Sequence, residues 1–391
     1  MVRATKQSSG AGAAHRPINW LSGIRVVEVT TGVAAPLSGR ILAELGADVV
    51  KVESRAKLDV NRVRVPRAAM SGLADPETLR LEGFGLLHEA SASKRSITLN
   101  LKNETGRELF LRLIGESDVF VQNFAPGWLE RLGLSVDELL ERFPRLVVLS
   151  ATGYGQDGPL RGQRAYAPIM SSLAGVEGLI GYEDGAVVGA SATAMADLNC
   201  SFYGAYLVLA ALNGRTRTGG GRHLDLSQTE ACVALIGEAM VEYAETGKAP
   251  GPVGNTAPTG RREVVPCRDG GWVVIEDVPD GVDPTEWAAM SDRDDLVARL
   301  QAGGVAATPV LTPDEVLTDP GFRGRGLFQQ VEHPVLGQLT ATSVPWHLDG
   351  AVPSVRSSSP LLGGHTEEIA RDLLGLEAAE ITRLATEGVF H

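Results

Sequence analysis

The sequence is poor in the residues that build disulfide frameworks and metal centres. It has 3 cysteines, at Cys200, Cys232 and Cys267, and no two of them form a C-x-x-C pair. Its 7 histidines show no H-E-x-x-H or comparable ligand spacing. Widely spaced thiols of this kind are typical of reduced cysteines inside the cell. We therefore expect no disulfide, no bound metal and a cytoplasmic location.

Positive charge and long apolar runs are also scarce. The formal net charge is -12, which argues against a general nucleic-acid binder but permits a local basic pocket. We find no run of 18 apolar residues, and so we expect no membrane span. Residues 1–17 are small and polar and lack the apolar core of a secretion signal, which predicts a disordered tail.

The glycine-rich fingerprints of nucleotide-binding proteins are absent. The turn after the first predicted strand reads TTGVAAPLSG, without the G-x-G-x-x-G of dinucleotide sites. Glu53 ends the second predicted strand, where a ribose-binding acid would stand in that fold, but one acid alone is weak evidence. The triplet GGG at 219–221 lacks the Lys-Ser/Thr of a phosphate-binding loop, and there is no G-x-S-x-G elbow. NAD-dependent and serine-hydrolase chemistry are therefore disfavoured.

What the first half does contain is an alternation of β-branched runs with helical patterns. Residues 24–29 and 48–53 are predicted strands on either side of the helical pattern LSGRILAELGA. They form a βαβ unit, which implies a parallel sheet. Further strands are predicted at 96–101, 118–122 and 146–150, with helices between them. We predict an α/β fold with a doubly wound, Rossmann-like parallel sheet.

The second half has a different texture. Residues 250–345 are rich in Gly, Pro and short β-like runs, and they predict a smaller, abbreviated α+β domain. Two amphipathic helices end the chain. The predicted organisation is a large α/β domain over 18–225, a linker helix with the small domain over 226–345, and C-terminal helices over 346–391 that return to the large domain.

Six blocks of the sequence carry a resemblance to a known family. In order, they are LSGIRVVEVTTGVAAPLSGRILAELGADVVKVES (21–54), KRSITLNLK (94–102), SDVFVQNFAPGWLERLGL (117–134), SATGYGQDGP (150–159), ADLNC…LAALNGRTRTGGGRHLDLS (196–227) and LLGGHTEEIARDLLGL (361–376). These blocks resemble the family III CoA-transferases, the group that includes formyl-CoA transferase, carnitine CoA-transferase and α-methylacyl-CoA racemase. The resemblance implies that the large domain binds CoA, that acyl-CoA is a substrate, that no cofactor is bound permanently, and that two interlocked chains form a homodimer.

The resemblance also assigns roles to single residues. It implies that Asp197 and Tyr166 are catalytic, with Asp197 as the acyl-accepting nucleophile. Without it, a surface Lys or Arg is ordinarily a solvated charge, and NF-x-P-G is an ordinary turn. An acidic protein that binds CoA nevertheless needs local cations for the phosphate groups. The implied CoA contacts are Arg55, Leu99, Lys102, Asn123, Phe124, Arg131 and Arg164.

The residues around Asp197 support two interpretations. Aspartate is a good helix N-cap, and the helical pattern SFYGAYLVLAAL begins a few residues later, although Asn199 and Ser201 could also cap it. A carboxylate near a helix start is also kept ionised by the helix dipole. It can then attack a thioester carbonyl to form a mixed acyl anhydride. We therefore predict transfer of CoA from an acyl-CoA to a carboxylic acid through Asp197.

Two alternatives stay open. Racemases of the same family carry His at the position of Tyr166, and a phenol, which ordinarily ionises at about pH 10, is a poor base. A racemase or other acyl-CoA isomerase is therefore less favoured. The segment between Trp272 and Trp287 is shorter than in the family, and only Gly254 or Gly260 could supply a glycine loop over the nucleophile. The second alternative is a catalytically degenerate member that binds CoA or a partner chain.

Overall fold

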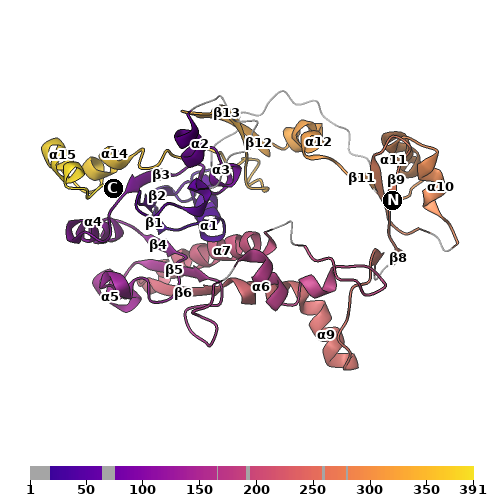
Figure 1. Ribbon diagram of the computed structural model, residues 1–391, viewed down its shortest axis with the longest axis horizontal. Helices are drawn as coiled ribbons and strands as arrows, with labels where there is room; N and C mark the ends of the chain where they lie inside the picture. The colour runs from indigo at the N-terminus through magenta and orange to yellow at the C-terminus, as the bar shows by residue number, and fades with distance from the viewer. Residues whose placement is uncertain (1–17, 64–74, 165, 191–193, 258–259, 279–280) are drawn as a thin grey trace. The chain divides into compact units, whose positions relative to one another are not determined.

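The computed structural model describes residues 18–63, 75–164, 166–190, 194–257, 260–278 and 281–391. The predicted disordered tail, residues 1–17, lies outside these described residues. The chain divides into two compact units, whose elements are labelled in Figure 1. The first unit comprises Met1–Gly162, Cys200–Leu226 and Gly326–His391, and the second comprises Gln163–Asn199 and Ser227–Arg325.

The first unit is built on a six-stranded sheet with the strand order β3-β2-β1-β4-β5-β6. The pairs β1–β2, β2–β3, β1–β4 and β4–β5 are parallel, and in this register Val27 lies opposite both Val50 and Phe120. The strand order reverses at β1, which is the doubly wound arrangement that the sequence predicted. The strands are β1 (Arg25–Val29), β2 (Asp48–Glu53), β3 (Arg95–Thr98), β4 (Val119–Gln122), β5 (Val147–Thr152) and β6 (Arg222–Ser227).

Both faces of this sheet are apolar because successive strand residues point to opposite sides. Val26, Val49 and Val147 pack on one face against α1 (Ala34–Glu44) and α7 (Met195–Thr218). The alternate residues of the same strands, such as Val27, Val50, Phe120 and Val148, pack on the other face. Each fully buried Val or Leu contributes about 1.5–3 kcal/mol relative to an exposed one. The two cores therefore hold the strand register, and with it the loops at the strand ends.

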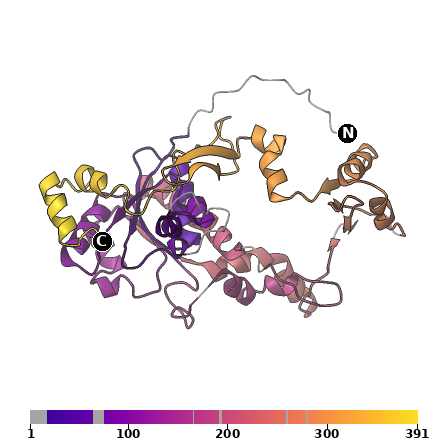
Figure 2. The same cartoon turned by 45° about the horizontal axis from the view of Figure 1, so that its top comes forward.

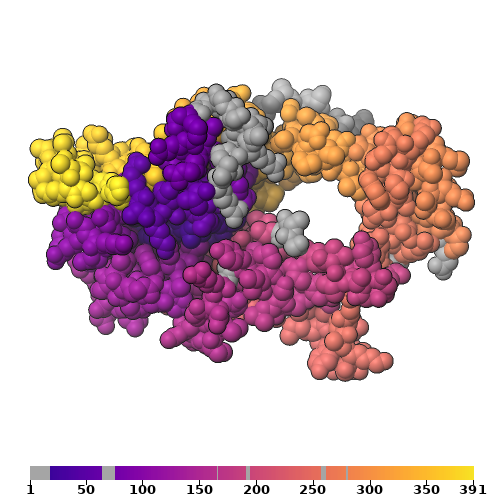
Figure 3. All heavy atoms as spheres, in the orientation of Figure 1, coloured from indigo at the N-terminus to yellow at the C-terminus, as the bar shows by residue number. Residues whose placement is uncertain are grey.

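The second face of the sheet is covered by α4 and by two helices from the C-terminal end of the chain. Here α4 (Glu104–Gly115) packs together with α14 (Thr366–Asp372) and α15 (Ala378–Thr386) in one buried cluster. In Figures 2 and 3 the two C-terminal helices, in yellow, lie beside α4, in purple. The main chain of Asn100, just after β3, donates a hydrogen bond to the carbonyl of Val389 at 2.8 Å. The C-terminal segment is thus fixed to the end of β3.

Helix α7 is long, and much of it is buried in the core. Cys200, Ala205, Val208 and Ala211 are buried in the first core of the first unit. By length and composition alone α7 would also qualify as a membrane span, with a mean hydropathy of 1.3. Of its most apolar window, 44% is buried inside the protein. Packing against the sheet therefore accounts for part of its apolar composition.

The second unit has two small apolar centres. One lies around α6 (Ala167–Leu173) and α8 (Gln228–Val233) and includes Met170 and Cys232. The other lies beneath an antiparallel sheet with the order β11-β10-β9, where Val273 stands opposite Val265. This combination of helices with a short antiparallel sheet agrees with the predicted abbreviated α+β domain. The elements of the second centre are β9 (Glu263–Pro266), β10 (Trp272–Ile275), α10 (Pro284–Ala289), α11 (Arg293–Ala302) and β11 (Ala307–Pro309).

The remaining elements connect these centres. In the first unit they are α2 (Pro76–Glu82), α3 (Gly85–Ser91), α5 (Val136–Arg142) and the hairpin β12 (Phe328–His333) and β13 (Gly337–Thr342). In the second unit they are α9 (Gly237–Thr246), the pair β7 (Thr256–Ala257) and β8 (Gly260–Arg261), α12 (Pro313–Thr318) and α13 (Pro320–Gly324).

Candidate active site

The parallel sheet brings most of the predicted CoA contacts to one edge of the first unit. In a parallel sheet the carboxyl ends of neighbouring strands meet at the same edge, and ligands bind where the strand order reverses. Arg55 follows β2, Leu99 and Lys102 follow β3, and Asn123 and Phe124 follow β4. Arg131 lies a little further on, in the 3-10 helix η3 (Glu130–Leu132). Predicted residues from three separate strands therefore come directly after those strands at one edge.

Asn123 is engaged with the turn after β1. Its Oδ1 accepts a hydrogen bond from the main-chain N–H of Thr31 at 2.9 Å, and its Nδ2 donates to the carbonyl of Thr31 at 2.8 Å. The side-chain amide thus replaces a backbone partner for Thr31 and joins the loops at the point of strand reversal. The role seen for this side chain is to hold the two loops together, which the ligand assignment from sequence did not foresee.

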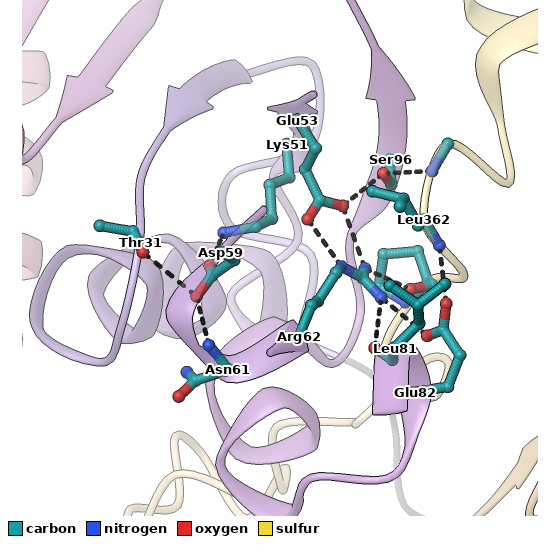
Figure 4. Close-up of polar contacts among 12 residues, drawn as sticks. Thr31, Lys51, Glu53, Asp59, Asn61, Arg62, Leu81, Glu82, Ser96 and Leu362 are labelled. Atoms are coloured by element: carbon teal, nitrogen blue, oxygen red, sulfur yellow. Dashed lines mark hydrogen bonds and ion pairs between the residues drawn. The ribbon is translucent and has the colours of Figure 1, made fainter. Parts of the chain in front are cut away.

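Asp59 grips the same turn from the loop after β2 (Figure 4). Its carboxylate accepts hydrogen bonds from the main-chain N–H of Gly32 at 3.0 Å and from Thr31 Oγ1 at 3.3 Å. Asn61 Nδ2 donates to the carbonyl of Gly32 at 2.7 Å. Gly32 has a φ of 77°, a conformation that favours glycine, so the turn is specified by its own sequence as well as by its neighbours.

The charge of Asp59 is balanced by a lysine inside the sheet. Lys51 is fully buried on β2, and its Nζ lies 2.9 Å from Asp59 Oδ2 and donates to the carbonyl of Thr30 at 3.0 Å. Burial opposes charge on Lys51, but the carboxylates of Asp59, Glu28 and Glu53 outweigh it and raise the pKa of Lys51. Burial likewise opposes charge on Asp59, and Lys51 together with backbone N–H donors lowers the pKa of Asp59. Both groups are therefore held charged.

Arg62 forms a second buried junction beside the first (Figure 4). Its guanidinium bonds both oxygens of Glu53, at 2.8 and 3.0 Å, and Glu82 at 2.7 Å. It also donates to the carbonyl of Pro360 at 2.9 Å. Burial opposes its charge, but the two carboxylates raise the pKa of Arg62 above its already high value. A bidentate, fully buried arginine of this kind fixes geometry on both sides.

This junction ties the C-terminal segment to the sheet edge. The main-chain N–H of Leu362 donates to Glu82 Oε1 at 3.1 Å, and the N–H of Gly363 donates to Ser96 Oγ at 2.9 Å. Ser96 Oγ in turn donates to Glu53 Oε2 at 2.6 Å. Arg55, a predicted CoA contact, donates from Nη2 to the carbonyl of Leu362 at 3.4 Å. The Arg62 junction therefore positions the chain segment that Arg55 contacts.

An aromatic pair with nearby cations lies after β4. The rings of Phe124 and Trp128 are stacked, with centroids 4.8 Å apart and planes at 19°. Lys57 Nζ lies 5.0 Å from the centroid of the Phe124 ring. The side chain of Arg131 lies beside Gly127, whose φ of 81° opens the turn. Lys57, Lys102 and Arg131 are all exposed, so their charges are available to a ligand.

Leu99 differs from the other predicted contacts. Its side chain is fully buried in the second core of the first unit, and its main-chain N–H donates to the carbonyl of Glu53 at 2.9 Å. The side chain of Leu99 therefore serves packing and does not reach the surface of the sheet edge. Lys102, three residues later, is exposed in the turn before α4.

Asp197, in the second unit, lies inside a helix and not at its cap. Helix α7 begins at Met195, so Asp197 is its third residue and stands in the first turn. The two other candidate caps also lie within the helix: Asn199 Nδ2 donates to the carbonyl of Ala231 at 2.6 Å, and Ser201 Oγ donates to the carbonyl of Ala34 at 2.9 Å. The capping interpretation was therefore wrong. A carboxylate in the first helical turn still feels the positive end of the dipole.

Asp197 is half-buried beside a small apolar centre. Its neighbour Ala196 is fully buried in the cluster that contains Cys232 and Val176. Burial raises the pKa of the Cys232 thiol, and the negative charges of Asp197 and then Glu177 raise it further. Glu177 was not singled out from the sequence. Its partners lie on α6 and in a turn near Ala190, positions that sequence spacing does not connect.

Arg164 and Tyr166 belong to the second unit as well. Tyr166 immediately precedes α6, has an extended backbone with φ −131° and ψ 155°, and is 65% exposed. Arg164 is exposed, and the residue between the two, Ala165, lies outside the described residues. Gly254, one of the two candidates for a covering loop, has a φ of 59° and lies against Glu183. The roles predicted for these residues stay predictions.

The sequence matches the model of CoA-transferase family III over residues 21–282 and 284–366. The chain belongs to family III of the CoA-transferases. It is 31% identical to the succinyl-CoA–L-malate CoA-transferase beta subunit of Chloroflexus aurantiacus, over 94% of this chain and 98% of that protein. It is 29% identical to the formyl-CoA:oxalate CoA-transferase of Streptomyces coelicolor, over 94% and 98%. Among solved structures, a CaiB/BaiF family protein from Brucella suis is similar, with a TM-score of 0.78, 28% identity and coverage of 90% and 99%.

As a family III CoA-transferase, this chain is an enzyme that acts on CoA thioesters. Its sheet edge offers more than the resemblance implied. The residues that the sequence missed are Lys51, Lys57, Asp59, Asn61, Arg62 and Trp128. One signal was present: Lys51 stands inside the run VVKVE, where a charge on a buried strand needs a partner.

Proposed function

We propose that this CoA-transferase moves CoA from an acyl-CoA thioester to a carboxylic acid, with Asp197 as the acyl-accepting nucleophile. The observation that carries the proposal is the place of Asp197 in the first turn of α7. The positive end of the helix dipole favours an ionised carboxylate there. An ionised carboxylate is a competent nucleophile toward a thioester carbonyl.

The proposed reaction conserves the thioester. A carboxylate oxygen of Asp197 bonds to the acyl carbonyl carbon, and the carbon–sulfur bond breaks with its electron pair leaving on CoA as a thiolate. The thiolate then attacks the aspartyl carbonyl of this mixed anhydride, which releases the donor acid as a carboxylate and leaves an aspartyl-CoA thioester. The acceptor carboxylate runs the same two steps in reverse and leaves as the new acyl-CoA. The balance needs no ATP, because each bond broken is replaced by one of similar energy.

We infer that CoA lies at the carboxyl edge of the parallel sheet in the first unit. The exposed cations Lys57, Lys102 and Arg131 support this, because phosphate groups need charge-assisted hydrogen bonds. The stacked pair Phe124–Trp128 offers an aromatic surface for an adenine ring. CoA enters and leaves as substrate and product in this proposal and is not a resident cofactor. Arg164 and Tyr166, assigned by resemblance to the thioester end, are part of the same proposal.

We also propose that the enzyme is a homodimer. Within the second unit, none of the residues of α9 is buried. Three of them have large apolar side chains: Met240, Val241 and Tyr243 are 52%, 58% and 57% exposed. Exposed large apolar side chains grouped on one helix are typical of a protein–protein contact. Light scattering after gel filtration is expected to give twice the chain mass of 41.3 kDa. A monomer at micromolar concentration would contradict the proposal.

The function is tested by incubating a panel of acyl-CoA donors with carboxylic acids and identifying new acyl-CoA products by mass spectrometry. We expect CoA exchange and a hydroxylamine-sensitive adduct on Asp197. In Asp197→Asn the exchange rate should fall roughly a thousandfold or more, because the covalent step is lost. CoA affinity should be retained. No exchange across a broad panel would overturn the proposal.

The same experiment separates the alternatives. A racemase or isomerase would exchange the acyl α-hydrogen with deuterated solvent and need no carboxylate acceptor. A degenerate binding member would bind CoA and give neither signal. The exposed phenol of Tyr166, in place of a histidine, disfavours the first of these.

A further inference from the structure

A buried ion pair lies beneath the start of α1. Its members are Lys94, directly before β3, and Glu28, near the end of β1, and both side chains are buried. Lys94 Nζ donates a hydrogen bond to Glu28 Oε1 at 2.7 Å. In the sheet β2 lies between β1 and β3. The pair therefore ties the segment before β3 to β1 across the strand that separates them.

The pair also holds both ends of the segment that links β1 to α1. Before the turn, Thr30 Oγ1 donates to Glu28 Oε1 at 3.1 Å. After the turn, Lys94 Nζ donates to the carbonyl of Pro36, in the first turn of α1, at 2.5 Å. Lys51 Nζ donates to the carbonyl and to Oγ1 of Thr30, at 3.0 and 3.2 Å. Buried charged groups thus fix the backbone at Thr30 and at Pro36.

Helix α1 makes room for the pair with a glycine. A Cβ atom at Gly39 would lie 2.1 Å from Glu28 Oε2 and 3.1 Å from Lys94 Nζ. Any side chain at this position would therefore push the carboxylate away from its place. Glycine inside a helix is destabilising relative to alanine. The sequence thus accepts a less stable helix at a position where the ion pair needs space.

The segment that the pair holds borders the proposed CoA site. It follows β1, where the strand order of the sheet reverses, and doubly wound sheets bind ligands outside the carboxyl ends of the strands at that point. Within the segment, Thr31 is held by Asn123, a predicted CoA contact, through two hydrogen bonds. A shift of the backbone between Thr30 and Pro36 would therefore move the Thr31–Asn123 junction as well.

We propose that Lys94 and Glu28 are positioning residues for CoA binding: as a charged pair they hold the segment between β1 and α1 in the conformation that binds CoA. The inference rests on the CoA site proposed at the sheet edge. Both residues are buried, so they act on the ligand through the backbone from Thr30 to Pro36. Full affinity for CoA then requires Lys94 to carry its proton.

The surroundings of Lys94 make this requirement measurable. Burial lowers the pKa of Lys94 to about 8, while Glu28 and Asp59 oppose the shift and Lys51 adds to it. This pKa lies below the ordinary value of lysine, so the folded chain releases the proton before the unfolded chain does. Stability should therefore rise with pH above about 8, whereas CoA affinity should fall. A Lys94 that served folding alone would give no such divergence.

The test compares the wild type with Lys94→Met, which keeps the length of the side chain and removes its charge. The dissociation constant of CoA is measured by titration calorimetry from pH 7 to pH 9. At pH 7 it should be about tenfold higher in the variant, because two charge-assisted hydrogen bonds are lost. At pH 9 the ratio should fall to about twofold, since Lys94 of the wild type is then largely neutral. The ratio cancels the ionisation of the CoA thiol.

Arg215→Met is the matched control. Arg215 is buried and pairs at 2.8 Å with Asp118, directly before β4 and so at the opposite edge of the same sheet. Its loss should lower the free energy of unfolding and leave the dissociation constant unchanged. Should Lys94→Met fail to fold, the double variant Lys94→Met/Glu28→Gln removes both charges and leaves neither partner as a lone buried ion. It should show the same weakened affinity, independent of pH over this range.

The outcomes separate this inference from the proposed function. If the wild type binds CoA and Lys94→Met binds it equally well at pH 7, the positioning role is wrong and the CoA site stands. A tenfold ratio that persists to pH 9, or an equal effect of Arg215→Met, would also overturn the role of the charged pair. If the wild type binds no CoA at any pH in this range, the proposed function fails and this inference falls with it.

Discussion

The sheet edge of the first unit contains fully buried ion pairs, whereas the ion pairs of the second unit lie nearer the surface. In the first unit the pairs Lys51–Asp59 and Lys94–Glu28 have side chains no more than 3% exposed. In the second unit the pairs Arg262–Glu276 and Arg268–Asp292 have side chains at least 38% exposed. Exposed pairs contribute about 0–1 kcal/mol, while buried pairs add little net stability but are costly to break.

The difference teaches what each region is built for. The CoA site proposed at the sheet edge needs several loops held in one arrangement, and a buried pair has few alternative geometries. The turn after β1 is gripped by Asp59, Asn61 and Asn123 from two neighbouring loops. The second unit is held by small apolar clusters, and its Glu177 accepts a hydrogen bond from Ser171. The first unit should therefore be the more sensitive to loss of a single charge.

The comparison would break most visibly at Arg62. We expect Arg62→Met to destabilise the first unit by about 3–5 kcal/mol, because Glu53 and Glu82 would be left buried without their cation. Burial already raises the pKa of Glu82 against the attraction of Arg62, so the loss of Arg62 should raise this pKa further. The free energy of unfolding is measured by urea denaturation.

Arg371→Met is the control for this substitution. Arg371 pairs with Asp372 at the surface, with side chains 58% and 49% exposed, and its loss should change the free energy of unfolding by less than about 1 kcal/mol. A loss below 1 kcal/mol for Arg62→Met too would contradict the contrast between buried and exposed pairs.

Mild acid should widen the difference between the two units, since only the first unit contains histidines. Neither segment of the second unit contains a histidine. In the first unit, burial and then His333 lower the pKa of His88 to about 4, and burial lowers the pKa of His333. The unfolded chain binds these protons near pH 6.5 and the folded chain does not, so stability is complete above pH 6.5 and falls as the pH drops toward 4.

The expected loss from His88 between pH 7 and pH 5 is about 1–2 kcal/mol. Urea unfolding at both pH values measures it. The variant His88→Gln, which cannot titrate, should lose less over the same interval. Equal losses in the variant and the wild type would show that other groups govern acid sensitivity.

The sequence was sufficient for local structure and insufficient for long-range polar contacts. Strands at 24–29 and 48–53 were predicted and found at Arg25–Val29 and Asp48–Glu53, because apolar runs and turns report directly on burial. The start of α7 was missed because aspartate has a high capping propensity. The helix in fact begins at Met195, two residues before Asp197. Asn123 contacts Thr31 across 92 positions, a pairing that only the strand order creates.

The next test removes one of the side chains that hold the turn after β1. Asn123→Ala removes both hydrogen bonds to Thr31, and we expect KM for acyl-CoA to rise about tenfold, since two bonds at roughly 1 kcal/mol each are partly compensated by the Asp59 and Asn61 contacts. Asn103→Ala is matched to it, because the side chain of Asn103 caps α4 in the same unit. That variant should lose about 1 kcal/mol of stability and keep its KM. The same rise in KM in both variants would make the effect a general softening.

The smallest expected effect concerns Lys57, which carries charge at the exposed rim of the edge. Lys57→Met should raise KM for acyl-CoA about threefold at low salt, because an exposed cation beside an aromatic ring or a phosphate contributes about 0.5–1 kcal/mol. The difference from the wild type should shrink as ionic strength rises, whereas the effect of Asn123→Ala should not, since hydrogen bonds between uncharged groups are little screened. Lys248→Met, in an exposed position after α9, is the control. Suppose that salt left the effect of Lys57→Met intact and removed that of Asn123→Ala. The assignment of Lys57 to screened electrostatic binding and of Asn123 to loop positioning would then be wrong. Asn123 would then contact CoA directly.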